Sequence, residues 1–131
     1  MTARRGAPPV RKSAAGHRRA WRHGRAAEAV AAGLLRLSGW RILARNWQSP
    51  VGEIDIIARR RHILAFVEVK TRAEIAAAGE AIGARQQERI RRAAALYLSR
   101  HPAAALLDAR FDAILVRPWR WPAHIRDAWR D

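Results

Sequence analysis

The sequence contains no cysteine. Disulfide bonds, thiolate metal sites and cysteine nucleophiles are therefore excluded. No uninterrupted apolar run is long enough to cross a bilayer, and the basic N-terminus is not followed by the apolar segment and cleavage site of a secretory signal. We therefore expect a cytoplasmic protein that does not bind a membrane.

Acidic residues and lysines are scarce as well. The 131 residues include 26 Lys and Arg but only 11 Asp and Glu, so the formal net charge is +15. The only lysines are Lys12 and Lys70, so arginine carries nearly all of the positive charge. Such an excess attracts polyanions over a long range, and nucleic acid is the commonest such partner, with an anionic membrane the next. A bias in coding composition is the alternative source of the arginines.

Half of the residues are hydrophobic, which at this length predicts one packed domain. Residues 1–22 carry many arginines and no acid, and we expect a disordered basic arm that either grips phosphates or is a solvated tail. The folded domain is predicted at 23–117, and a tail rich in Trp and Arg follows at 118–131.

Hydrophobic spacing predicts the order helix, three strands, helix, strand. The first predicted helix, at 25–38, has an apolar face of Ala27, Val30, Leu34 and Leu37. Strands follow at 40–47, 53–58 and 63–70, with a polar turn at 59–62 between the second and the third. A helix at 80–100, a strand at 110–116 and a short helix from Ala123 complete the predicted elements. Short turns make the first three strands antiparallel, and the long second helix lets the fourth strand lie parallel to the third. We therefore predict an α/β fold with a mixed four-stranded sheet flanked by helices.

Two of the predicted strands carry charged residues among apolar ones. Asp55 lies in the strand at 53–58, and Glu68 and Lys70 lie in the next strand. With a four-residue hairpin loop, Glu53 would lie opposite Glu68, and Asp55 and Glu68 would be diagonal neighbours on one face. A loop of three or five residues would place these two carboxylates on opposite faces.

Two carboxylates on one face can share a divalent cation. Hard oxygen ligands with open positions suit Mg²⁺ or Mn²⁺, and we expect Asp55 and Glu68 to be the metal ligands. Lys70 would point toward the same ion, where it orients or helps to deprotonate water, or stabilises charge on a phosphate in the transition state. A buried salt bridge is the alternative, but one lysine cannot neutralise three nearby acids.

Three blocks of sequence resemble a known family. They are Gly-Trp-Arg-Ile-Leu-Ala-Arg-Asn-Trp (39–47), Gly-Glu-Ile-Asp-Ile-Ile-Ala (52–58) and Phe-Val-Glu-Val-Lys-Thr-Arg (66–72). Asp55 and the Glu-Val-Lys at 68–70 resemble the PD-(D/E)xK nuclease superfamily, and the three blocks together are similar to the YraN family of small bacterial proteins. The resemblance covers about residues 24 to 116. It implies a restriction-endonuclease-like fold and a nuclease-like domain at 23–117.

Two further residues are candidate catalytic groups. Glu28 lies beside the apolar stripe of the first helix, where it is either a further group of the site or an exposed partner for a nearby arginine. Gln86 lies on the inner line of the second helix with Ile90, Ala93 and Tyr97. Members of the similar family tend to carry a lysine early in this helix, and related nucleases use a helical lysine or glutamine to assist. An ordinary helix residue is the alternative for Gln86.

Other residues are candidate nucleic-acid contacts. Arg72, Arg85 and Arg89 could bind DNA phosphates, and the alternative is a solvated helix face. Trp119 and Trp121 alternate with arginines and could stack on unpaired bases, but we expect them to pack the tail onto the domain.

The predicted function is that of a metal-dependent DNA endonuclease, which hydrolyses phosphodiester bonds and acts structure-selectively in DNA repair, recombination or processing. A nucleic-acid-binding module of the same fold, with weak or no catalysis, is the alternative. A protein-binding role through the basic tail is a third reading. Many nucleases of this fold form homodimers to cut both strands, so a homodimer is open to this chain as well.

Overall fold

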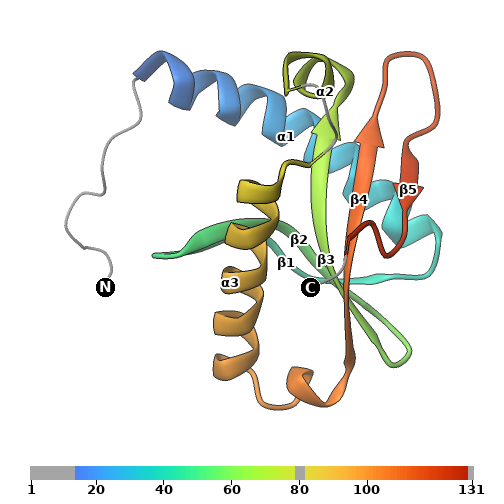
Figure 1. Cartoon of the computed structure of the whole chain (residues 1–131). Coiled ribbons are helices and arrows are strands. Elements are labelled where there is room, and N and C mark those ends of the chain that lie inside the picture. Colours follow the sequence, from blue (N-terminus) through green and yellow to red (C-terminus); the bar gives the residue numbers. More distant parts are fainter. Residues whose placement is uncertain (1–13, 79–81, 130–131) are drawn as a thin grey trace.

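Five strands form one mixed sheet, and helices pack on both of its faces (Figure 1). The computed structural model describes residues 14–78 and 82–129. The strands follow one another across the sheet in chain order. The elements are α1 (Ala14–Leu37), β1 (Arg41–Ser49), β2 (Gly52–Arg60), β3 (Ile63–Thr71), α2 (Arg72–Ala78), α3 (Ala84–Arg100), the 3-10 helix η1 (Ala104–Leu106), β4 (Asp108–Val116) and β5 (Ala123–Ile125).

The strand directions agree with the prediction for the first four strands. β1, β2 and β3 form an antiparallel meander, and β4 lies parallel to β3 after the crossover through α2 and α3. The predicted α/β architecture is confirmed, but the sheet has five strands rather than four. The predicted short helix from Ala123 is wrong, because residues 123–125 pair antiparallel with residues 113–115 of β4. This pairing satisfies backbone groups that β4 would otherwise expose at the sheet edge.

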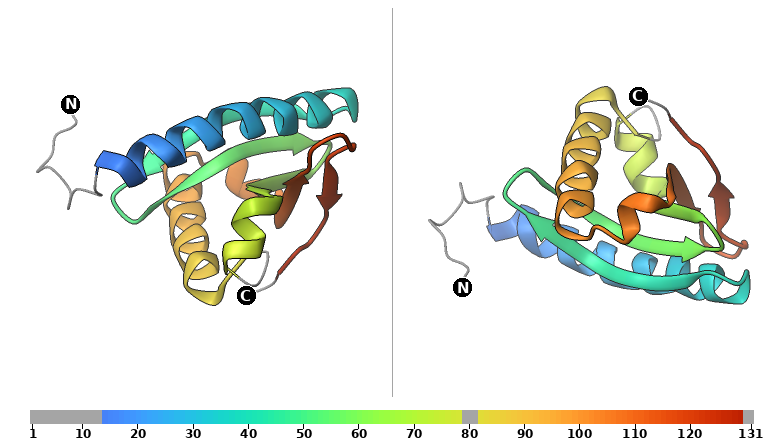
Figure 2. Two further views of the ribbon diagram at one scale, coloured as in Figure 1. Left: turned by 90° about the horizontal axis from the view of Figure 1, so that it is seen from above. Right: turned by 90° about the horizontal axis from the view of Figure 1, so that it is seen from below.

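Different helices cover the two faces of the sheet (Figure 2). α1 packs on one face, and its core is formed by Ala27, Ala31, Ala32, Leu35, Trp40, Ile56, Ala58, Ala65, Val67, Val69 and Ile114. α3 packs on the other face, and its core is formed by Ile54, Ile57, Leu64, Phe66, Ile82, Ile90, Ala93, Ala94, Tyr97, Ala113 and Trp129. Successive residues of a strand point to opposite faces, so the apolar runs in β2 and β3 supply both cores. Among the described residues, no helix is long and apolar enough to span a membrane.

The helix boundaries differ from the prediction. α1 begins at Ala14, so residues 14–22 of the predicted arm are helical, while residues 1–13 lie outside the described residues. The predicted helix at 80–100 begins only at Ala84, after Gly83 in an extended conformation, and a separate helix, α2, precedes it. The inner line of α3 is confirmed, since Ile90 and the buried residues beyond it face the sheet.

α1 also turns a different face to the sheet from the one that its larger apolar residues predict. Val30 and Leu37 are 45% and 80% exposed, whereas Leu35 and the neighbouring alanines Ala31 and Ala32 are fully buried. The small alanine side chains let the helix lie close to the strands. This orientation also buries Glu28, which is only 4% exposed.

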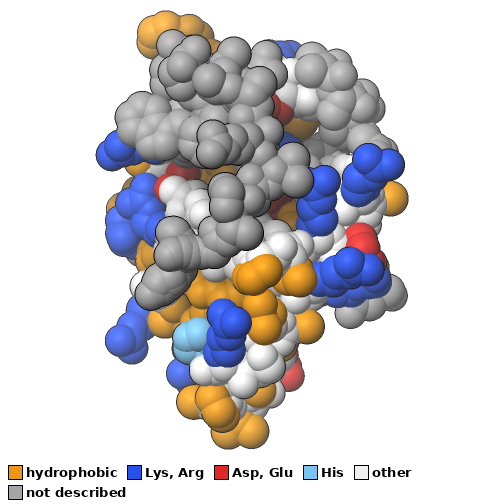
Figure 3. Space-filling view, turned by 90° about the vertical axis from the view of Figure 1, so that its left-hand side faces the viewer, with side chains coloured by type: hydrophobic (Ala, Val, Ile, Leu, Met, Phe, Trp, Pro, Cys, Tyr) orange, Lys and Arg blue, Asp and Glu red, His pale blue; other side chains and the backbone are white. Residues whose placement is uncertain are grey.

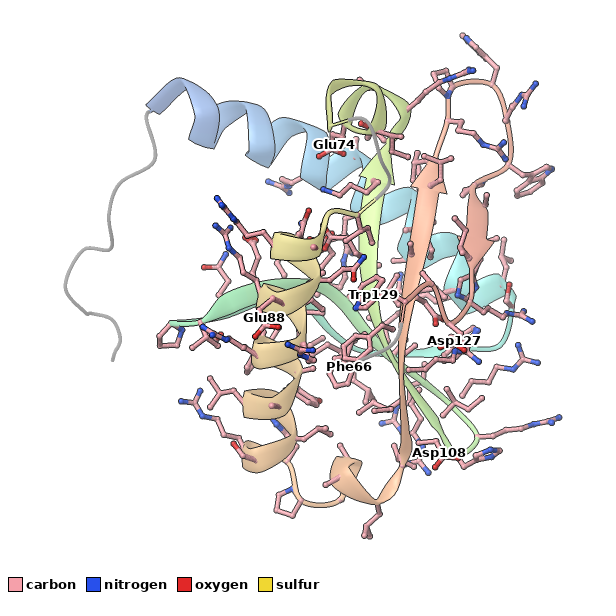
Figure 4. The ribbon with its side chains drawn as sticks, viewed as in Figure 1. Phe66, Glu74, Glu88, Asp108, Asp127 and Trp129 are labelled. Carbon is pink, nitrogen blue, oxygen red and sulfur yellow. The ribbon has the colours of Figure 1, made fainter. Side chains whose placement is uncertain are left out.

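Aromatic rings fill the core on the α3 side. Phe111 lies between Phe66 and Trp129, with ring centroids 5.8 and 5.3 Å apart, respectively. Figure 4 shows Phe66 and Trp129 in the space between α3 and the sheet. Trp129 therefore packs the C-terminal segment onto the domain. The prediction that Trp119 and Trp121 do so is wrong, because both are exposed.

Asp112 is a fully buried carboxylate that ties the C-terminal segment to the sheet. Arg110 donates hydrogen bonds to both of its oxygens, each at 2.9 Å. His124 Nε2 lies 2.8 Å from Oδ2, and the Asp127 backbone amide donates to Oδ1 at 2.9 Å. Burial alone would raise the pKa of Asp112, but the hydrogen bonds to His124, Arg110 and the Asp127 amide outweigh it and lower the pKa. This carboxylate is a structural anchor for β5.

We expect Asp112→Ala to lower the free energy of unfolding by about 3–5 kcal/mol, because Arg110 and His124 lose their buried partner. Urea denaturation at neutral pH would measure this change. Asp108→Ala is the matched control on the same strand, since the Asp108 side chain is 78% exposed and its ion pair with His62 contributes about 0–1 kcal/mol. Because folding lowers the pKa of Asp112, its contribution is present above the ordinary value of 3.8 and is lost as the pH falls through the lowered value. Equal losses in the two variants would contradict the anchoring role.

Candidate functional site

A two-residue turn sets the register between β2 and β3. Arg61 and His62 form the turn, and Arg61 has a positive φ of 57°, as tight hairpin turns require. Arg60 therefore pairs with Ile63, and the ladder continues to Ile56 and Val67.

Asp55 and Glu68 come directly after the last pair of this ladder, and a hydrogen bond between their side chains affects the pKa of both. The predicted four-residue loop is wrong, and so is the predicted pairing of Glu53 with Glu68. The predicted loop of four residues and the observed loop of two both have an even number of residues. The difference in length therefore leaves each side chain on the same face of the sheet. The side chains of Asp55 and Glu68 meet just beyond the last pair of the ladder.

Asp55 is held against the backbone of the neighbouring strand. The Val69 amide donates a hydrogen bond of 2.8 Å to Asp55 Oδ2. On the other side of β2, the pairs that flank Asp55 place Asn46 of β1 opposite it, and Asn46 has a positive φ of 49°. The regular alternation of the strands is disturbed here, since Ile54 and Ile57 both belong to the core on the α3 side. The Asp55 carboxylate therefore lies against β3 and points toward Glu68.

Glu68 is 5% exposed and has two partners from different elements. Gln86 of α3 donates a hydrogen bond of 2.5 Å from Nε2 to Glu68 Oε2. Lys70 Nζ lies 3.4 Å from the same oxygen, and the Lys70 side chain is 17% exposed. The structure therefore brings together Asp55, Glu68, Lys70 and Gln86, the four candidates from β2, β3 and α3.

Gly52 lets α3 approach the start of β2 closely enough for this contact. Its φ is 154°, and a Cβ at this position would lie 3.1 Å from the Arg89 carbonyl oxygen. A side chain larger than hydrogen would press against the backbone of α3. Gln86 lies one helical turn before Arg89, so this contact helps to position the amide that reaches Glu68.

The two neighbouring carboxylates are electrostatically unfavourable. Burial raises the pKa of Asp55 from 3.8 to about 6, although the Val69 amide acts in the opposite direction. Burial and then the negative charge of Asp55 raise the pKa of Glu68 well above 4.5, and Lys70 only partly offsets this. Additional positive charge is therefore needed before both groups are stable as carboxylates near neutral pH.

Glu28 adds a third acid on the α1 side. Asn46 Nδ2 donates to Glu28 Oε1 at 3.0 Å, and Arg45 Nη2 lies 3.3 Å from the same oxygen. Glu28 Oε2 is buried, and no described residue donates a hydrogen bond to it. A cavity of about 380 Å³ opens here, lined by Arg25, Glu28, Arg45 and Asn46. The negative charge of Glu28 also contributes to the raised pKa of Asp55, so the two sites are electrostatically linked.

Arg45 and Asn46 were not singled out by the sequence patterns, although both lie in the block at 39–47 that resembles the family. Their role depends on the side from which α1 approaches, and no strand periodicity reports that. The exposed-partner alternative for Glu28 is excluded, because its side chain is buried.

The donor set fits a divalent cation held by two carboxylates. Among the described residues, no group of three or more His, Cys, Asp or Glu side chains is placed to hold an ion alone. Mg²⁺ commonly takes one or two carboxylates and completes its shell with water and substrate phosphate oxygens. Asp55 and Glu68 supply the two carboxylates, and burial raises the pKa of both. These observations make the pair suitable for Mg²⁺ or Mn²⁺.

The three candidate phosphate contacts lie on exposed surface. Arg72 opens α2 directly after β3, and Arg85 and Arg89 lie on the outer side of α3. No ion pair among the described residues engages Arg85 or Arg89, whereas Glu88 pairs with Arg91 and Arg92. Figure 3 views the molecule from the α3 side, and its described part shows many more basic than acidic side chains.

The sheet, its helices on both faces and the acids on β2 and β3 define an α/β protein of restriction-endonuclease-like architecture. A family model described as uncharacterised protein family UPF0102 matches residues 27–116. The chain belongs to this family, which is the YraN family that the three sequence blocks indicate.

Individual relatives agree with this assignment. A UPF0102 protein of Parvibaculum lavamentivorans is 54% identical over 111 residues, which are 85% of this chain and 84% of the relative. One of Paramagnetospirillum magneticum is 48% identical over 128 residues, 95% and 96% of the two chains. One of a Bradyrhizobium species is 51% identical over 124 residues, 94% and 88% of the two chains. The names of these relatives state the family and no activity.

We expect Asp55→Asn to stabilise the metal-free protein at alkaline pH by roughly 1–2 kcal/mol. Folding raises the pKa of Asp55 to about 6, so wild-type stability is highest below the ordinary value of 3.8 and falls as the pH rises through about 6. Asparagine has no proton to lose and removes this fall. Thermal unfolding in EDTA across this pH range measures the effect, with the exposed Asp108→Asn as a matched control. A variant less stable than wild type at about pH 8 would show that burial of the ionised Asp55 carboxylate does not destabilise the fold.

Proposed function

We propose that this protein is a divalent-metal-dependent hydrolase of phosphodiester bonds in nucleic acid, with DNA as the expected substrate. The single observation that carries the proposal is the meeting of the Asp55 and Glu68 carboxylates on adjacent strands, with Lys70 3.4 Å from Glu68. Metal-assisted phosphodiester hydrolysis needs a Lewis acid, an oriented water and stabilisation of charge. The site contains a candidate group for each of these three requirements.

A purely structural ion pair explains the arrangement less well. Arg45 pairs with Glu28, and Lys70 can neutralise one further carboxylate, but Asp55 and Glu68 are two acids that share this one lysine. In the structural cluster around Asp112, cationic and amide partners lower the pKa of the carboxyl group, whereas at Asp55 and Glu68 the pKa values are raised. An arrangement that keeps two acids in repulsion is the pattern expected of a functional site.

Each residue of the proposed site has a separate role. Asp55 and Glu68 would hold Mg²⁺ or Mn²⁺, which supplies Lewis-acid chemistry and neutralises phosphate charge. Gln86 fixes the orientation of the Glu68 carboxylate through its amide. Lys70 holds a positive charge at the site, where it stabilises negative charge on the phosphate or orients the attacking water. Glu28, with one buried oxygen that no described residue satisfies, can accept a hydrogen bond from water.

Nucleic acid is the substrate class that the charge supports. The chain carries a net charge of +15, and the exposed Arg72, Arg85 and Arg89 lie on the elements that adjoin the site. Phosphate contacts of this kind position a backbone without reading its sequence. Weak sequence preference and selection by the structure of the DNA follow from this, which suits a role in DNA repair, recombination or processing.

The test is cleavage of labelled single-stranded, duplex, flap and four-way-junction DNA with Mg²⁺, Mn²⁺ or EDTA. We expect wild type to cut only with metal. Asp55→Asn and Lys70→Ala should each lose roughly a hundredfold or more in rate, because each removes a group that stabilises the transition state. Asp108→Asn is the matched control and should cut like wild type, since Asp108 is an exposed acid at the other end of β4.

Equal cutting by Asp55→Asn and wild type would show that the activity comes from elsewhere and would end the proposal. If wild type cuts nothing but binds DNA with an affinity that falls steeply with salt, the chain is a binding module without catalysis. Calorimetry with Mg²⁺ or Mn²⁺ separates these cases further, because the proposed ligands predict a binding signal that Asp55→Asn loses.

A further inference from the structure

Two tryptophans in the connection from β4 to β5 are exposed to solvent. Trp119 is 101% exposed and Trp121 is 76% exposed, whereas Trp40 and Trp129 are 4% and 9% exposed. Arg120 lies between the two exposed rings and is itself exposed. Large aromatic side chains that are left in water next to each other commonly mark a binding surface.

The loop that carries them is held in shape. Arg117 Nη2 donates a hydrogen bond of 2.8 Å to the Trp121 carbonyl oxygen, which closes the loop across four residues. Pro118 and Pro122 stand before and after the exposed rings, and each limits the backbone. Trp119 has a φ of 59°, which a bulky residue rarely adopts. Strained backbone of this kind is often found at ligand-binding positions.

The sheet register places this loop at the same end of the sheet as the acidic site. Lys70 pairs with Leu115, and Thr71 pairs with Val116, in parallel strands. The loop therefore leaves β4 beside the start of α2, as Figure 1 shows at the top of the sheet. Trp119 lies four positions after Leu115, so with the strand spacing the Cα atoms of Lys70 and Trp119 lie at most about 19 Å apart. That reach is on the order of five nucleotides of a stacked strand.

The charge around the rings is positive. Arg117 and Arg120 both belong to the loop. Alternating aromatic and cationic side chains suit single-stranded nucleic acid, because bases stack on the rings while phosphates pair with the arginines. A blunt duplex keeps its bases stacked on each other and cannot use the rings in this way.

We propose that the loop at 117–122 is a stacking platform for unpaired bases, so that the preferred substrate carries a single-stranded segment next to the bond that is cut. The inference rests on the proposed function in taking nucleic acid as the substrate. It goes further in naming the substrate class: flaps, overhangs and splayed junctions rather than continuous duplex. Two tryptophans with arginines would also suit an anionic membrane surface, but the shared sheet end with the acidic site favours nucleic acid.

The test measures binding in EDTA, where no metal-dependent cutting interferes. Fluorescence anisotropy would compare wild type with Trp119→Ala, Trp121→Ala and the double variant. The probes are a labelled single strand, the blunt duplex of the same sequence, and that duplex with a single-stranded flap. We expect roughly a tenfold loss of affinity per tryptophan for the single strand and the flap. Affinity for the blunt duplex should change by less than about twofold.

Leu106→Ala is the matched control. Leu106 is 87% exposed on η1, at the opposite end of the sheet, so its removal also takes away exposed apolar surface (Figure 1). It should leave every affinity unchanged. Trp119→Phe keeps a ring and should retain part of the single-strand affinity, which separates stacking from a change in the shape of the loop.

Unchanged single-strand affinity in the double variant would overturn the proposal, as would an equal loss on the blunt duplex. Loss of binding to vesicles of anionic phospholipid, with DNA binding intact, would overturn it in favour of a membrane surface. The result is independent of catalysis. If the protein cuts no DNA but binds single strands through these tryptophans, this inference stands and the proposed hydrolase activity fails. If the protein cuts DNA and the tryptophan variants bind single strands like wild type, the hydrolase stands and this inference fails.

Discussion

The pairing register of β2 with β3 is the constraint on which the rest of the site depends. A tight turn at Arg61 and His62 sets it, and the ladder ends at the pair of Ile56 and Val67, next to Asp55 and Glu68. A slip of one residue would turn one of these acids toward the apolar core on the α1 side, away from its present partners. The apolar residues that alternate with the acids oppose such a slip, because they would lose their own burial.

Buried acids in this protein occur in two electrostatic settings. Asp112 has cationic and amide partners that outweigh the cost of burial, and it fastens β5 and the C-terminal segment to the sheet. Asp55 and Glu68 face each other with fewer partners, and their pKa values rise. The same residue types therefore stabilise the fold in one place and store repulsion in another. The repulsion between Asp55 and Glu68 is the physical basis for proposing a cation at their site.

The proposed site needs elements from both faces of the sheet. α3 brings Gln86 to Glu68, and the close contact at Gly52 helps to set its distance. α1 brings Glu28 to the side chains of β1, which hold one of its oxygens. The parallel pairing of β3 with β4 then aligns the exposed tryptophan loop with the same end of the sheet. Catalytic, phosphate-binding and base-stacking groups would thus act on one bound strand.

Local patterns in the sequence determined the first four strands, their directions and the three residues Asp55, Glu68 and Lys70, because alternation and charge within apolar strands are visible one strand at a time. Only the tertiary structure decided the register of β2 with β3 that brings the two acids together, since loop length is not visible in periodicity. It also decided the face of α1, where small alanines rather than Val30 and Leu37 contact the sheet and so bury Glu28. The addition of β5 and the exposure of Trp119 likewise depended on contacts between segments that are distant in the chain. The decisive contacts are the pairing of β5 with the open edge of β4 and the hydrogen bond from His124 to Asp112.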